Sequence, residues 1–247
     1  MSFFMICTAS EAITPVNTHA LFYDANQAYE KGEFETAIQK YESLLQTIPP
    51  TGSLYYNLGN CYFRLQKIGW AILYYERAKK LIPSDPDLDF NLRYARDQIE
   101  DEIEKQTSNP MIFMLENVSL AELFWFFVII NTLFWLMLII RRWHQSEWSY
   151  YVLVGLTIIW GLSAMSLSIR WFNDIKDVRG VVVASEVIVR AGPEQNDTGL
   201  FKLHAGTIVQ CERKDSEWQL IQFTHDKRGW VKSEDVIQIA DNHASYF

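Results

Sequence analysis

The sequence predicts a multidomain protein with an all-α helical repeat domain, a two-helix transmembrane hairpin and a small all-β barrel, in that order. Three observations lead to this prediction. Residues 20–83 match themselves at an offset of 34 positions, residues 111–172 are mostly apolar, and residues 178–240 change from a helical to an alternating pattern. An apolar block between two polar parts indicates domains held on a membrane anchor.

The first residues have the pattern of a truncated secretory signal peptide over residues 1–12. A short apolar stretch is followed by small residues, with Ser10 and Ala12 placed for cleavage. The basic segment that normally precedes the apolar stretch is missing. The alternative is a frayed N-terminal tail, but the membrane topology derived below requires a way across the membrane.

The 34-residue offset predicts a helical domain over residues 17–106, with repeats at about 17–50 and 51–84. The coincident pairs are Ala37/Ala71, Ile38/Ile72, Tyr41/Tyr75, Glu42/Glu76 and Pro49/Pro83. Two repeats do not bury a continuous core, so we expect a third, capping helix over residues 85–106. Ser84 or Asp85 would cap the start of this helix.

The second copy resembles the tetratricopeptide repeat. The signature positions of that family are filled by Tyr55, Leu58, Gly59, Tyr62, Ala71, Tyr75, Ala78 and Pro83. The resemblance implies pairs of packed helices, with the first helices of the repeats lining a groove that binds peptide segments.

Four polar residues are candidate ligand contacts in that groove. Asn57, Asn60 and Arg64 fall at i, i+3 and i+7 on one helical face, and Asn91 lies 34 positions after Asn57. In clamp-type tetratricopeptide repeats, asparagine at this position holds the ligand backbone and a nearby base binds a carboxylate. The match is partial, because the remaining clamp bases are missing. The alternative is that all four are ordinary polar surface residues.

The apolar block predicts transmembrane helices over residues 118–141 and 149–171. Its two apolar runs are Leu120–Ile140, of 21 residues, and Tyr150–Ile169, of 20 residues without a charge. At about 1.5 Å per residue, each would cross roughly 30 Å of bilayer core. The alternative is a helical hairpin buried in a soluble protein.

The charges around these helices predict the orientation of the hairpin. Arg141 and Arg142 lie in the short connection between the helices, and short positive loops stay in the cytoplasm. We therefore expect a two-pass protein of a bacterial inner (cytoplasmic) membrane with a cytoplasmic hairpin loop. Both the repeat domain and the β domain would then be periplasmic. Arg170 and Lys176, which follow the second helix, are the opposing signal.

Residues 178–240 contain five short β-type runs, which suggest a small barrel. Four stretches resemble the bacterial SH3 domain in order and spacing, namely VIVRAGP from Val187, LHAGTIV from Leu203, WQLI from Trp218 and GWV from Gly229. Trp218 and Trp230 are candidates for a ligand-stacking pair, although packing in the core is the favoured interpretation. His204 and Cys211 are expected to be structural.

The motifs of enzymes are missing from the sequence. It has no phosphate loop, no G-x-S-x-G and no metal-spaced histidine cluster. The net charge is −8, without a basic patch, so nucleic acid is not expected as a partner. Cys7, Cys61 and Cys211 lie too far apart for a zinc motif. We expect a non-enzymatic scaffold or adaptor without a cofactor or a metal.

The order of the parts resembles the BatE family of the bacterial Bat (aerotolerance) system, most clearly over Ser53–Asp97. This resemblance implies protein partners with von Willebrand A domains, a MoxR-type ATPase and a role in envelope stress. Two other functions stay open. One is a membrane protein that binds cell-wall peptidoglycan through its β domain, and the other is a membrane enzyme with a site near Glu122 and Asn131.

Overall fold

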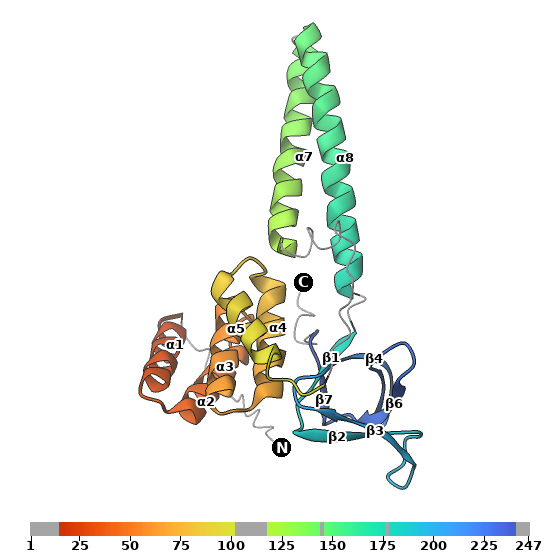
Figure 1. Cartoon of the computed structure of the whole chain (residues 1–247). Coiled ribbons are helices and arrows are strands. Elements are labelled where there is room, and N and C mark those ends of the chain that lie inside the picture. The colour runs from red at the N-terminus through yellow and green to blue at the C-terminus, as the bar shows by residue number, and fades with distance from the viewer. Residues whose placement is uncertain (1–14, 102–117, 144–145, 176–177, 241–247) are drawn as a thin grey trace, which may run out of the picture.

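The computed structural model describes residues 15–101, 118–143, 146–175 and 178–240. Three parts follow one another along the chain, as Figure 1 shows: a helical part, a long pair of helices and a β part. The predicted signal peptide at residues 1–12 lies outside the described residues.

The helical part contains two helix pairs and a fifth helix. The pairs are α1 (Pro15–Glu30) with α2 (Phe34–Leu45) and α3 (Gly52–Arg64) with α4 (Ile68–Leu81), followed by α5 (Pro86–Arg96). The capping helix was predicted to reach residue 106, which is wrong, because α5 ends at Arg96 and residues 97–101 are not helical. These last residues turn toward the β part.

Local sequence explains where these helices begin and end. The Thr51 side chain accepts a hydrogen bond from the backbone N–H of Leu54 at 3.3 Å and caps α3. Of the two predicted caps of α5, Ser84 and Asp85, it is Asp85 that accepts a hydrogen bond from the N–H of Leu88, at 2.9 Å. Gly32 has a φ of +81°, a left-handed conformation that suits the turn after α1.

Close helix packing in the second pair depends on Gly59. A Cβ atom at this position would lie 2.5 Å from the ring of Tyr75, whose side chain is almost completely buried. Ala71 on α4 is fully buried as well. Small residues thus let α3 and α4 approach, and the tyrosine ring fills the space between them.

The long helices α7 (Leu120–Trp143) and α8 (Glu147–Ile175) run side by side away from the rest of the molecule (Figure 1). Both are long and apolar enough to cross a membrane, and only 6% of the most apolar window of each is buried. Such exposure does not fit a hairpin buried in a soluble core. The chain therefore has the features of a two-pass membrane protein.

The β part is a single antiparallel sheet with the strand order β3-β2-β6-β5-β4-β1-β7. The strands are β1 (Arg179–Val182), β2 (Glu186–Arg190), β3 (Gly199–His204), β4 (Ile208–Asp215), β5 (Trp218–Gln222), β6 (Arg228–Lys232) and β7 (Val236–Gln238).

Two features of this sheet differ from the prediction. There are seven strands instead of five: β3 was missed, and the last predicted run divides into β6 and β7 at a turn. The sheet is also not a closed barrel, because β3 and β7 are its two edges.

The helical and β parts are packed directly against each other, with α4 next to β1 (Figure 1). Val181 and Ile239 belong to the same buried cluster as the repeat helices. Gly69 on α4 is so near β1 that a Cβ atom there would lie 2.5 Å from the Val182 carbonyl oxygen. Lys80 of α4 also forms an ion pair with Asp174 near the end of α8, at 3.5 Å.

Candidate functional site

The predicted ligand-contacting asparagines belong to hydrogen-bond networks between neighbouring repeat helices. In the first network, the Tyr41 hydroxyl donates to Asn26 Oδ1 at 2.5 Å. The Asn57 amide donates to the same Asn26 oxygen at 3.3 Å. This network joins α1, α2 and α3, and its members are at least partly buried.

The second network has the same form one repeat later. The Tyr75 hydroxyl donates to Asn60 Oδ1 at 2.7 Å, and the Asn91 amide donates to the same oxygen at 3.1 Å. Asn91 also donates to the Tyr56 hydroxyl oxygen at 2.9 Å. Burial raises the pKa of Tyr75 well above its ordinary value, so its hydroxyl remains a donor.

These networks give the asparagines a role that the sequence analysis did not identify. The side-chain oxygens of Asn26 and Asn60 each accept two hydrogen bonds and tie consecutive first helices together, so that α1, α3 and α5 lie in one layer. Asn26 was missed, although its offset of 34 from Asn60 is visible in the sequence. Ligand contact by Asn57, Asn60 and Asn91 stays a prediction. A ligand would have to share these side-chain amides with the hydrogen bonds that they already make between helices.

Arg64 differs from the asparagines because its side chain is exposed at the end of α3. Its guanidinium lies 5.0 Å from the ring centroid of Phe34, at the start of α2. This cation–π contact holds the charge at the surface, where it can meet an acidic group. Of the four predicted residues in the repeats, Arg64 is exposed, and the three asparagines are half-buried.

An aromatic surface lies on α3 and α5, where Phe90 and Tyr94 are exposed and Tyr56 and Phe63 are half-buried. The rings of Phe63 and Tyr94 lie 5.7 Å apart across the two helices, and Phe90 stacks on Tyr94 at 6.4 Å. The side chains of Phe90 and Tyr94 are 63% and 54% exposed. This α3–α5 aromatic surface was missed, although Tyr56 and Phe90 are also 34 positions apart.

The two tryptophans of the β part are not equivalent. Trp218 and Trp230 lie on one face of neighbouring strands, since Trp230 pairs with Leu220, two residues after Trp218. Trp230 is only 7% exposed, and the guanidinium of Arg213 covers its ring at 5.1 Å. Trp218 is half-buried. Packing is therefore the role that the geometry gives to Trp230.

A third polar cluster, which the sequence analysis missed, lies where the helical and β parts meet. Asp101 accepts three hydrogen bonds: from the His204 backbone N–H at 2.7 Å, from His204 Nδ1 at 2.9 Å and from the Thr207 hydroxyl at 2.5 Å. The Glu100 carboxylate lies 3.5 Å from Nε2 of the same imidazole. A cavity of about 410 Å³ opens beside it, lined in part by Lys67, Trp70 and His204.

The charges in this cluster stabilise one another. The hydrogen bond with Asp101 raises the pKa of His204. Burial alone would raise the pKa of Asp101, but the hydrogen bonds from Thr207 and His204 outweigh it and lower that pKa. The Thr207 hydroxyl donates to Asp101 and not to the imidazole, so this is a contact between domains and not a nucleophile with its base.

The comparison with known protein families concerns the second helix pair. A family model of the tetratricopeptide repeat matches residues 53–85, which contain most of α3 and all of α4. No curated protein matches the chain. Repeats of this kind are associated with protein partners. The chain contains a tetratricopeptide repeat over residues 53–85.

Proposed function

We propose that the protein is a non-enzymatic, membrane-anchored adaptor that binds an extended segment of another envelope protein on its repeat helices. The observation that carries this proposal is the α3–α5 aromatic surface, which exposes Phe90 and Tyr94 next to Phe63. Contiguous exposed aromatic side chains are typical of binding surfaces, because their burial stabilises a complex at little cost in side-chain entropy.

The chemistry of this surface suggests what the partner segment presents. An apolar or aromatic side chain would pack on Phe90 and Tyr94, and an acidic group would pair with Arg64, which adjoins Phe63 on α3. The asparagine networks would hold α3 and α5 at the separation that this contact needs. Asn60 and Asn91 would thus position α3 and α5, and Asn57 would hold α3 against α1.

The proposed topology is a cytoplasmic hairpin loop with both domains in the periplasm of a bacterial inner membrane. Direct packing of Gly69 against β1 supports placing the two domains on the same side of the membrane, since they flank the hairpin in the chain. Arg141 and Arg142 at the end of α7 support a cytoplasmic loop.

We further propose that the β part is a divergent bacterial SH3 domain and that the protein acts in a Bat-type complex. The proposed partners are von Willebrand A-domain membrane proteins and a MoxR-type ATPase system, as the resemblance of residues Ser53–Asp97 to BatE implies. The peptidoglycan-binding alternative would use Trp218 and Trp230 as a stacking pair. Burial of Trp230 beneath Arg213 speaks against it.

Photocrosslinking in native membranes would test the proposed binding surface. A photoreactive phenylalanine analogue replaces Phe90 in the full chain, and the crosslinked partner is identified by mass spectrometry. The matched control is Tyr23, which is also 63% exposed. Tyr23 is equivalent to Asn57 by the 34-residue period, and Asn57 points to the preceding helix, so Tyr23 points to the open end of the repeats.

We expect crosslinks from position 90 and not from position 23. With the purified partner, Phe90→Ala should weaken binding by about tenfold or more, which corresponds to at least about 1.4 kcal/mol. Tyr23→Ala should leave the affinity unchanged. Equal affinities of wild type and Phe90→Ala for the crosslinked partner would remove this surface from the binding mechanism.

A further inference from the structure

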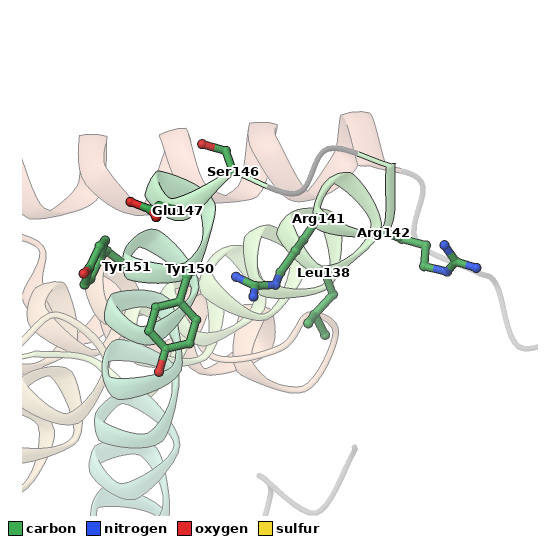
Figure 2. Close-up of a pocket in the computed structure, with 7 residues that line it drawn as sticks. All are labelled: Leu138, Arg141, Arg142, Ser146, Glu147, Tyr150 and Tyr151. Atoms are coloured by element: carbon green, nitrogen blue, oxygen red, sulfur yellow. The ribbon is translucent and has the colours of Figure 1, made fainter.

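A cavity of about 740 Å³ lies at the turn of the hairpin, between the last turn of α7 and the first turns of α8 (Figure 2). Its lining is rich in hydroxyl and guanidinium groups. The lining residues are Leu138, Arg141, Arg142, Ser146, Glu147, Tyr150 and Tyr151.

Arg141 is the central charge of this cavity. Its side chain extends from α7 toward α8 in Figure 2, whereas Arg142 points away. The Arg141 guanidinium lies 5.2 Å from the Tyr150 ring centroid. Its Nη1 atom is buried and has no hydrogen-bond partner among the described residues. Glu147 lines the same cavity but is not ion-paired with either arginine in the described parts of the two helices.

A guanidinium nitrogen that is shielded from water and lacks an acceptor is unfavourable. An anion with several oxygen atoms would satisfy it, and the planar fork of arginine matches phosphate oxygens best. Ser146 and Tyr151 also line the cavity, but their hydroxyls point away from Arg141 in Figure 2. Arg141 is therefore the side chain whose chemistry suits a phosphate group here.

The position of the cavity indicates where this phosphate comes from. Trp143 and Trp148 on either side of the turn are 88% and 79% exposed, as expected for aromatic side chains at the surface of a bilayer. Moving away from the turn along α7 and α8, the side chains become mostly apolar. If the hairpin crosses the membrane, the cavity lies at the level of the lipid headgroups.

We propose that this cavity binds the phosphodiester headgroup of an anionic phospholipid, with Arg141 as the principal contact. The headgroup phosphate would accept hydrogen bonds from the Arg141 guanidinium, while the acyl chains lie along the apolar faces of α7 and α8. The proposal rests on the membrane-hairpin part of the proposed function, and it is independent of the binding surface on the repeats.

Native mass spectrometry of the full chain in detergent would test this assignment. The purified protein is titrated with phosphatidylglycerol, with phosphatidylcholine or with inorganic phosphate, and bound adducts are counted. We expect phosphatidylglycerol to bind about tenfold more tightly than phosphatidylcholine, with no measurable competition from inorganic phosphate at millimolar concentration. Inorganic phosphate that competes as well as the lipid would overturn the lipid assignment.

Two substitutions at Arg141 distinguish a specific site from general charge attraction. Arg141→Gln should weaken phosphatidylglycerol binding by about tenfold. Arg141→Lys should weaken it less, because it keeps the charge that orients the hairpin and removes only the planar fork. The matched control is Arg142→Gln, which makes the same charge change at the next residue, whose side chain points away from α8 in Figure 2.

Phosphatidylglycerol binding that is unchanged in Arg141→Gln, or reduced equally in Arg142→Gln, would contradict the proposal. Circular dichroism would verify that each variant is folded. The lipid-binding measurement involves no protein partner. A negative result would therefore leave the proposed binding surface on α3 and α5 unaffected.

Discussion

One carboxylate, Asp101, binds His204 at both its backbone and its side chain, although the two residues are 103 positions apart. Asp101 follows the repeat helices, and His204 ends β3. The Thr207 hydroxyl completes the contact. The three donors are the His204 backbone, the His204 ring and the Thr207 hydroxyl, and they bind one carboxylate. Together they fix both the distance and the orientation of the β part relative to the repeats.

Asp101→Asn should loosen this contact between the domains. An amide cannot accept from all three donors, and its NH2 group would meet the His204 and Thr207 donors. Loss of a charge-assisted hydrogen bond of this kind costs on the order of 1.5–3 kcal/mol. The measurement is the melting temperature of the full chain in detergent. Asp97→Asn, an exposed carboxylate at the end of α5, is the control and should leave that temperature unchanged.

Stability should depend on pH through the same pair. The pKa of His204 is raised, so its contribution is fully present below the ordinary histidine value of 6.5 and is lost as pH rises through the raised pKa. The pKa of Asp101 is lowered, so its contribution is present above the ordinary value of 3.8 and is lost as pH falls through the lowered pKa.

The domain contact should therefore be strongest between these two ordinary values, and melting curves from pH 3 to pH 9 would check this. Asp101→Asn should flatten the profile on both sides, because it removes the carboxylate and the partner that raises the pKa of His204. A variant profile with the same shape as the wild-type profile would mean that other groups cause the pH dependence.

The repeat packing can be tested at a glycine. Gly59→Ala would place a Cβ atom 2.5 Å from the Tyr75 ring, which is confined in the core. Overpacking of this kind should lower the free energy of unfolding by about 1–3 kcal/mol. Gly155→Ala is the matched control, since Gly155 lies in a helix with nothing within 4 Å of the added atom. Equal melting temperatures for the two variants would show that α3 and α4 do not pack in this way.

Membrane topology can be measured with alkaline phosphatase fusions, because the enzyme is active only outside the cytoplasm. Fusions after Gln106 and after Asp241 should be active, and a fusion at Gln145, next to the Arg141–Arg142 pair, should be inactive. A green fluorescent protein series at the same positions should give the opposite pattern. Activity at Gln145 alone would reverse the proposed orientation.

Periodic features of this fold could be predicted from the sequence, and contacts between distant residues could not. The 34-residue offset and the apolar runs are local patterns, so the helix pairs and the two long helices followed from them. Strand β3 was missed because GLFKLH, with its exposed Leu200, alternates too weakly. Whether the sheet closes into a barrel depends on how its edge strands β3 and β7 lie in space. Local sequence patterns do not contain this information.

The candidate site shows the same division. The sequence identifies Asn57 and Asn91 as equivalent residues, but a period cannot tell a ligand contact from a bond between helices. Exposure separates Arg64 from the asparagines, and exposure needs the fold. The Asp101–His204 contact has no signal in a single sequence, because neither residue lies in a repeated or spaced motif.

The shared core has a consequence for the order in which the protein is made. Val181 and Ile239 complete the apolar cluster of the repeats, yet they are synthesised after both long helices. Until the β part has been synthesised and has packed against α4, the face of α4 that carries Gly69 and Ile72 is exposed. A chain that stops before β1 therefore leaves an apolar face of α4 exposed, and we expect such a truncated chain to be more sensitive to proteolysis than the full chain.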